Sequence, residues 1–127
     1  MTANPVPLVL VVEPDSIQRD LIHLCLSSIG CDVILAQSPD QVIPLISKKF
    51  PSMLILDTFI PDSSGLEILN DLKQTKYFKN IIVLLISSFG FPDIIQKAKK
   101  IGVYEFLIKP IDSIEFSKRV KTLLKIN

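Results

Sequence analysis

The chain has 127 residues, enough for one compact domain, and its 48% hydrophobic and 21% charged residues are typical of a folded globular protein. Fourteen basic and thirteen acidic residues give a formal net charge of +1, and no basic stripe with interleaved aromatic residues predicts nucleic-acid binding. No apolar run reaches the roughly 18 residues of a membrane span, and the N-terminus does not resemble a secretory signal, so we expect a cytoplasmic location.

The first third of the chain predicts a strand, a helix and a second strand. Residues 8–13 form a nearly continuous apolar run ending in a carboxylate, as expected of a strand that is buried on both faces. Residues 16–29 predict a helix that Gly30 closes. Its apolar residues at helical spacing are Ile17, Leu21, Leu24 and Cys25. Residues 32–36 predict the second strand.

The middle of the chain continues this alternation. Ser38, followed by proline, aspartate and glutamine, is expected to cap a second helix, which Pro44 should shorten or kink. Residues 53–57 predict a third strand, which again ends in a carboxylate. A polar loop over residues 58–64 then leads into a helix over residues 65–74.

The last third predicts two more strands and two more helices. Residues 81–86 are the most apolar strand and are expected to be central, residues 92–101 predict a helix, and residues 104–108 predict the fifth strand. Asp112, with Glu115 three residues later, begins the final helix as a capping box. Its inward-facing residues are expected to be Phe116, Val120, Leu123 and Leu124.

Five strands alternating with five helices predict an α/β fold, a doubly wound (βα)5 three-layer sandwich around a five-stranded parallel sheet. We expect residues 1–127 to form a single domain with its core at about residues 8–125. In such sheets ligands bind at the carboxyl ends of the strands, where the strand order reverses. The residues at or just beyond those ends are Glu13, Asp57, Ser87 and Lys109.

The chemistry of these four residues suggests phosphoryl transfer. Two carboxylates on neighbouring strand ends repel each other unless a cation lies between them, and Mg²⁺ binds one or two carboxylates together with phosphate oxygens. A lysine and a hydroxyl provide donors for a phosphoryl group, and aspartate is a known nucleophile for it. The alternative is that the strand ends of any such fold collect polar residues, and the residue types alone do not decide between the two.

The sequence L-I-L-D-T-F-I-P-D-S-S-G-L-E-I-L, at residues 54–69, resembles the phosphoacceptor segment of response-regulator receiver domains. In that pattern an apolar strand ends in the acceptor aspartate, and proline and glycine follow four and eight residues later. Asp57, Pro61 and Gly65 match these positions.

Two further segments extend the resemblance to nearly the whole chain, over residues 8–124. The apolar run that ends in Ser87 is similar to the family's fourth strand, and F-L-I-K-P, with Lys109 before Pro110, is similar to its fifth. The resemblance implies the flavodoxin-like, CheY-like topology with strand order 2-1-3-4-5. It also implies a cis Lys109–Pro110 bond, whereas sequence alone favours trans.

The resemblance implies a mechanism for two-component (phosphorelay) signalling. Asp57 would accept a phosphoryl group from a sensor histidine kinase or a phosphotransfer protein, and Lys109 and Ser87 would bind phosphoryl oxygens. Mg²⁺ would be held by Glu13, Asp57 and the backbone carbonyl of Phe59. Such a chain has at most self-phosphorylation and self-dephosphorylation activity and does not turn over a small-molecule substrate.

The resemblance also implies a switch. Phe106 matches the aromatic residue that turns inward when the hydroxyl at Ser87 moves toward the phosphate, which changes the face that meets a downstream effector protein or output domain. The alternative for Phe106 is an ordinary half-buried strand aromatic. A homodimer formed through the last helices is also compatible with the sequence.

The chain departs from the family at the end of the first strand. The family has two adjacent acidic residues there, but here Pro14 follows Glu13 and offers no side-chain oxygen. Asp15 is a candidate third ligand, although it has a rival role as a helix cap. We therefore expect weakened or absent metal binding, and an interaction-only pseudo-receiver is the alternative function. Against it, Asp57, Ser87 and Lys109 are all present together.

Two aromatic residues flank the expected acceptor site. Phe59 and Phe89 lie two residues beyond Asp57 and Ser87, where the family admits the hydrolytic water. Bulky apolar rings should hinder that water, which predicts a long-lived phosphoryl aspartate. The alternative is that both rings simply pack on their loops.

Overall fold

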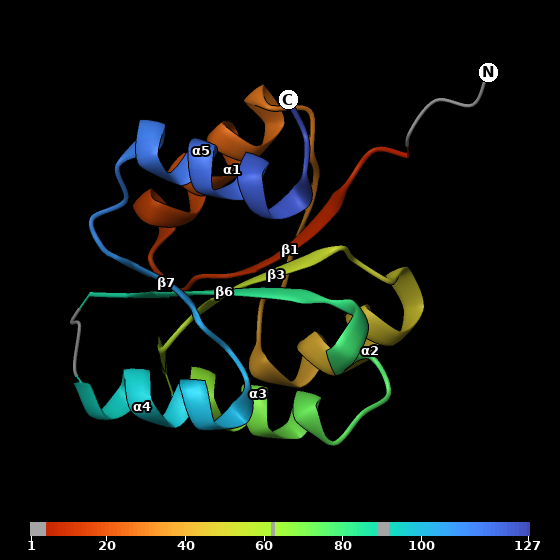
Figure 1. Cartoon of the computed structure of the whole chain (residues 1–127), viewed down its shortest axis with the longest axis vertical. Coiled ribbons are helices and arrows are strands. Elements are labelled where there is room, and N and C mark those ends of the chain that lie inside the picture. The colour runs from red at the N-terminus through yellow and green to blue at the C-terminus, as the bar shows by residue number, and fades with distance from the viewer. Residues whose placement is uncertain (1–4, 62, 89–91) are drawn as a thin grey trace.

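The computed structural model describes residues 5–61, 63–88 and 92–127, and Figure 1 shows three layers with a sheet in the middle. Five strands form this parallel sheet: β1 (Leu8–Val12), β2 (Asp32–Leu35), β3 (Met53–Asp57), β6 (Ile82–Ser87) and β7 (Glu105–Ile108). Five helices cover it: α1 (Ser16–Ser28), α2 (Val42–Lys49), α3 (Gly65–Lys73), α4 (Pro92–Ile101) and α5 (Ser113–Leu124).

The sheet order is β2-β1-β3-β6-β7, which confirms the predicted topology once a small extra strand pair is set aside. That pair, β4 (Phe59–Ile60) and β5 (Ser63–Ser64), is antiparallel and lies within the loop predicted after β3. Among the described residues, no helix is long and apolar enough to cross a membrane.

The sheet separates two apolar clusters. Helices α1 and α5 cover one face and α2, α3 and α4 cover the other (Figure 1). Successive strand residues point to opposite faces, so in β1 Leu10 packs into the cluster under α2–α4 and Val11 into the cluster under α1 and α5. Every residue of β3 is buried. This two-sided burial explains why the strand sequences are apolar throughout rather than alternating.

The predicted inner face of α1 is partly wrong. Ile17 and Leu24 are exposed, and the buried residues of the helix are Ile22, Cys25 and Leu26. Apolar residues occupy several sides of this helix, so the spacing of the sequence does not select one face. Packing against the sheet makes that selection.

The start of the second helix also differs from the prediction. Ser38 makes no capping hydrogen bond, and a 3₁₀ turn, Pro39–Gln41, precedes α2. The helix has eight residues, and Pro44 is the third of them. Because the first four N–H groups of a helix have no partner within it, a proline at this position removes no hydrogen bond. The capping aspartate of α5 is as predicted, since Asp112 Oδ1 accepts from the backbone N–H of Glu115 at 2.9 Å.

Candidate functional site

The carboxyl ends of the strands, which we call the carboxyl edge, bring the four predicted site residues together. Glu13 follows β1, Asp57 ends β3, Ser87 ends β6 and Lys109 follows β7. Glu13, Asp57 and Ser87 are all buried, and Asp57 is only 2% exposed. A hollow of about 380 Å³ is lined by Asp57, Ser87 and Lys109 among other residues. At this edge, a buried carboxylate therefore lies beside a small hollow that a ligand could enter.

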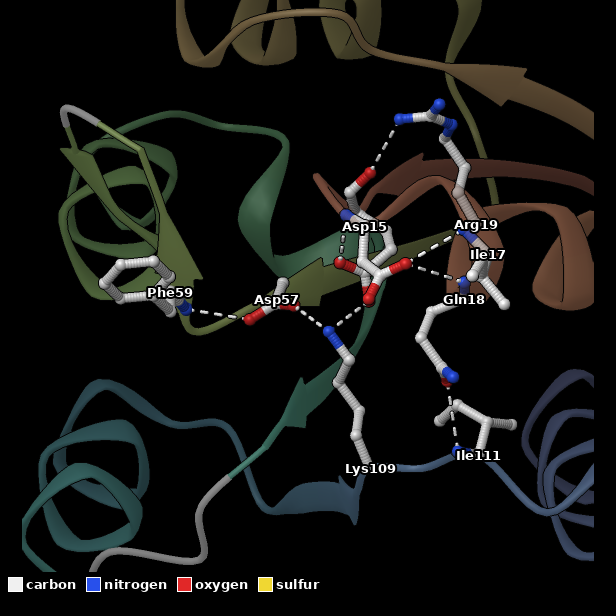
Figure 2. A network of polar contacts seen from close by, with 9 residues as sticks. Asp15, Ile17, Gln18, Arg19, Asp57, Phe59, Lys109 and Ile111 are labelled. Carbon is white, nitrogen blue, oxygen red and sulfur yellow. Dashed lines mark hydrogen bonds and ion pairs between the residues drawn. The ribbon is translucent and has the colours of Figure 1, made fainter.

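Lys109 links the two carboxylates. Its Nζ lies 2.7 Å from Asp57 Oδ2 and 2.7 Å from Glu13 Oε1. Figure 2 shows the Lys109 side chain reaching up from the end of β7 toward Asp57. The ammonium thus neutralises part of the negative charge that the fold concentrates here.

The protonation of this cluster reflects its burial. Burial raises the pKa of Glu13 to about 7, although its hydrogen bond to Lys109 opposes the rise and the neighbouring Asp57 adds to it. Burial alone would lower the pKa of Lys109, but hydrogen bonds to Asp57 and Glu13 raise it above the ordinary lysine value. Lys109 therefore stays charged, and Glu13, with a pKa of about 7, titrates near neutral pH.

Local backbone contacts hold Asp57 in place. Its Oδ1 accepts from the N–H of Phe59 at 2.8 Å, and the N–H of Thr58 donates to the carbonyl of Ile86 at 2.9 Å. Gly65 packs so closely that a Cβ atom there would overlap the backbone oxygen of Asp57 and lie 2.9 Å from the Cα of Thr58. The glycine of the predicted motif thus allows close packing against the backbone of Asp57.

Two contacts from α1 support the site, and the sequence did not predict either. Gln18 Oε1 accepts from the N–H of Ile111 at 3.1 Å, which ties α1 to the segment after Lys109. Arg19 Nη1 donates to the carbonyl of Glu13 at 3.2 Å. Both are polar residues on a helix, and nothing in the local sequence distinguishes them from polar residues that only face solvent.

The Lys109–Pro110 peptide bond is cis, as the family resemblance implied. The N–H of Lys109 donates to the carbonyl of Ser87 at 2.7 Å, so β6 and β7 are joined at the point where both site residues lie.

Asp15 caps α1. Its Oδ1 accepts from the N–H groups of Ile17 at 2.9 Å and Gln18 at 3.3 Å, and its own N–H donates to Glu13 Oε2 at 3.1 Å. This is the rival role considered for Asp15. Its role as a metal ligand stays a prediction.

The carboxyl edge offers few side-chain ligands for Mg²⁺. Within the described residues, no three His, Cys, Asp or Glu side chains cluster as a metal site. Glu13 and Asp57 remain, and two carboxylates with phosphate oxygens are a donor set that Mg²⁺ accepts. The ammonium of Lys109 lies between these carboxylates and shows that a positive charge is accommodated there. An ion would have to share the two carboxylates with Lys109.

The structure describes two of the three predicted aromatic residues, and they occupy different settings. Phe106 is half-buried and packs against the cluster under α2–α4, on the strand β7 that pairs with β6 beside Ser87. Phe59 is 74% exposed at the rim of the hollow, so it does not pack on its loop. Phe89, the other residue predicted to limit water access, lies outside the described residues.

Comparison with known proteins agrees with this geometry. The chain is 29% identical over 118 residues to sporulation initiation phosphotransferase F of Bacillus subtilis (strain 168), an alignment that covers 93% of this chain and 94% of that protein. It is 24% identical to the phosphate regulon transcriptional regulatory protein PhoB of Pseudomonas aeruginosa, over 92% of this chain but 51% of that protein, so it spans about half of that relative's length.

Solved structures show the same fold. The chemotaxis response regulator CheY4 of Vibrio cholerae superposes with a TM-score of 0.85 at 20% identity, over 94% of this chain and 99% of that one. The sequence model of the response regulator receiver domain matches residues 9–121. The chain therefore belongs to the response regulator receiver domain family of two-component signalling.

Proposed function

We propose that this receiver domain, which we take to span residues 1–127 as one unit, accepts a phosphoryl group on Asp57 from a histidine kinase or a phosphotransfer protein. The observation that carries the proposal is the position of Asp57. Its carboxylate is buried at the base of a hollow, 2.7 Å from the ammonium of Lys109, and Ser87 lines the same hollow. A cytoplasmic location remains our expectation for a chain with such partners.

The chemistry follows from these contacts. A carboxylate oxygen of Asp57 forms the new O–P bond while the P–N bond to the donor histidine breaks, and the histidine nitrogen keeps the electron pair. We expect Lys109 and the Ser87 hydroxyl to bind phosphoryl oxygens, and the charge of Lys109 to offset the added negative charge. Mg²⁺, when bound, would neutralise the remaining charge, with Glu13, Asp57 and the Phe59 carbonyl as its proposed protein ligands.

The readout would be a change at the face formed by α4, β7 and α5. Phe106 lies on β7, and Ile108 of the same strand pairs with Ser87 in the sheet. The proposed movement of the Ser87 hydroxyl toward the phosphate would therefore change the contacts of β7, the strand that carries Phe106. A downstream effector protein, an output domain or a second copy of the chain would meet this face.

A phosphorylation-independent pseudo-receiver is the second candidate, and one observation favours it. The ammonium of Lys109 already lies 2.7 Å from a carboxylate oxygen of both Glu13 and Asp57, so the buried charges are paired without a metal ion. Pro14 also removes a carboxylate that the family places beside Glu13. The fold would then serve only as a protein-interaction module.

Mass spectrometry after incubation with acetyl phosphate separates the two candidates. The native chain, Asp57→Asn and Asp71→Asn would each be incubated with and without Mg²⁺; Asp71 is an exposed carboxylate on α3 and serves as the matched control. We expect one added phosphoryl group on the native chain and on Asp71→Asn, and none on Asp57→Asn or without Mg²⁺.

The same experiment should be repeated with a phosphohistidine donor protein. If neither donor modifies the native chain, the pseudo-receiver is the correct function. If Asp57→Asn is still modified, the acceptor has been assigned to the wrong residue.

A further inference from the structure

A second hollow lies at the opposite edge of the sheet, where the strands begin. We call it the amino-edge hollow. It has a volume of about 330 Å³, and its lining residues are Ile46, Phe50, Pro51, Lys76, Tyr77, Lys79, Asn80 and Ile81. A cavity of about 150 Å³ can hold a benzene ring, so this hollow has room for at least one large apolar side chain.

Phe50 lines the hollow, and neither its backbone conformation nor its burial accounts for an aromatic residue at this position. It ends α2 in the left-handed conformation, with φ 49° and ψ 56°, a position where glycine is preferred and other residues are strained by about 1 kcal/mol. Its ring is nevertheless 69% exposed, and it meets the edge of the Tyr77 ring at a centroid distance of 6.1 Å. A glycine would serve the backbone better, so the aromatic ring itself is the feature to explain.

The two chain segments that flank this hollow are rich in positive charge. Residues 48–52 and 73–81, which flank it, contain five lysines and no carboxylate. Within the described residues, none of the ion pairs involves these lysines. Lysines at the last turns of α2 and α3 are favoured by the helix dipoles, but Lys76 and Lys79 lie beyond the end of α3. Lys76 Nζ lies 5.6 Å from the centroid of the Tyr77 ring, and both lysines are exposed to solvent.

We infer that the amino-edge hollow binds an acidic peptide segment of a partner protein, with one large apolar side chain packed against the rings of Phe50 and Tyr77 and carboxylates beside Lys76 and Lys79. The concave shape favours a peptide over a membrane, which would need a protruding apolar wedge. The two rings lie at 66° to each other and offer no parallel platforms for stacked bases, which disfavours single-stranded nucleic acid.

This site is separate from the phosphoryl acceptor. Pro51, which lines the hollow, lies six positions before Asp57, which ends β3, and six residues of extended chain span about 20 Å. Peptide binding at the amino edge therefore needs no phosphorylation, and the inference does not depend on the proposed function of Asp57.

A peptide display library of random twelve-residue sequences tests the inference. The native chain is the bait, and each round is counter-selected on a Phe50→Gly/Lys79→Glu double variant. We expect enriched peptides that place a leucine, phenylalanine, methionine or tryptophan between aspartates or glutamates. We expect their Kd, measured by fluorescence anisotropy, to weaken at least about tenfold for the double variant, which is about 1.4 kcal/mol.

The controls separate this site from the rest of the chain. Lys118→Glu makes the same charge change on α5, on the other face of the sheet, and should leave the Kd unchanged, as should Asp57→Asn. Phe50→Gly should fold at least as stably as the native chain, because glycine relieves the left-handed strain.

Three outcomes would overturn the inference: no enrichment over the double variant, enriched peptides without carboxylates, or tighter binding to phosphatidylserine vesicles or to oligouridine through the same residues.

Discussion

The two edges of the sheet treat charge in opposite ways. At the carboxyl edge, the buried carboxylates of Glu13 and Asp57 each lie 2.7 Å from the ammonium of the half-buried Lys109. At the amino edge, the lysines stay in solvent around an apolar hollow. Buried charges interact strongly and hold a fixed geometry, while solvated charges interact weakly and over a wider area. The first edge is therefore suited to chemistry on one small charged group, and the second to contact with a larger partner.

The largest expected effect comes from removing the central cation of the carboxyl edge. Lys109→Met leaves two buried carboxylates without their partner and should lower the free energy of unfolding by about 3–5 kcal/mol. Urea denaturation at pH 8 and pH 5 measures this, and the loss should be smaller at pH 5, where Glu13 carries a proton.

Arg119→Met is the matched control for this prediction. The Arg119–Glu105 pair is 3.2 Å apart with both side chains more than a third exposed, so its loss should change stability by less than about 1 kcal/mol. Equal losses for the two variants would mean that burial does not strengthen the Lys109 cluster.

The second prediction concerns pH and Glu13. Its pKa is about 7 in the folded chain and near the ordinary 4.5 when unfolded, so folding takes up a proton between these values. Stability should therefore fall as pH rises from about 4.5 to 7, by about 3 kcal/mol at most. Thermal unfolding without Mg²⁺ across this range should show the slope for the native chain and lose it in Glu13→Gln. The same slope in both would show that another group titrates.

The third prediction tests the close packing behind Asp57. Gly65→Ala places a methyl group against the backbone of Asp57 and Thr58 and should lower the free energy of unfolding by about 1–3 kcal/mol. Gly30→Ala is the comparison. Gly30 has φ +89° but open space around it, so only backbone strain of about 1 kcal/mol is expected. If Gly30→Ala is the more damaging variant, crowding at Asp57 is not what requires the glycine.

The smallest effect is kinetic and depends on phosphorylation at Asp57. Phe59→Ser opens the rim of the hollow and should speed hydrolysis of the phosphoryl aspartate about three- to tenfold, roughly 1 kcal/mol of barrier. Its decay after removal of acetyl phosphate can be followed by mass spectrometry. Phe50→Ser alters an equally exposed ring at the amino edge and should leave the decay rate unchanged. An unchanged rate in Phe59→Ser would rule out the ring as a barrier to water.

The sequence predicted the strands and the meeting of Glu13, Asp57, Ser87 and Lys109 because strand ends in a parallel sheet share one edge. It did not predict the direct Lys109–Glu13 pair, since the reach of a long side chain depends on tertiary geometry. The prediction of which face of α1 is buried was partly wrong for a similar reason. Ile22 and Leu24 are equally apolar, and only packing on the sheet decides that the first is buried.

Three roles remain predictions: Asp57 as the phosphoryl acceptor, the metal ligands, and Phe106 as a switch. Each depends on a reaction, a bound ion or a movement, and the positions of the side chains are only compatible with it. The amino-edge hollow had no signal in the sequence at all. Phe50 and Tyr77 are 27 positions apart, and only the fold brings their rings together.

The sheet that divides the two apolar clusters also shapes how mutations combine. Leu10 and Val11 are neighbours in the chain but pack on opposite faces, so the free-energy effects of truncating each should be nearly additive. Leu10 and Leu54 are far apart in sequence but are register partners on one face, so their truncations should be coupled. Coupling between mutations in the strands should therefore depend on whether the two side chains lie on the same face of the sheet, and not on their distance along the sequence.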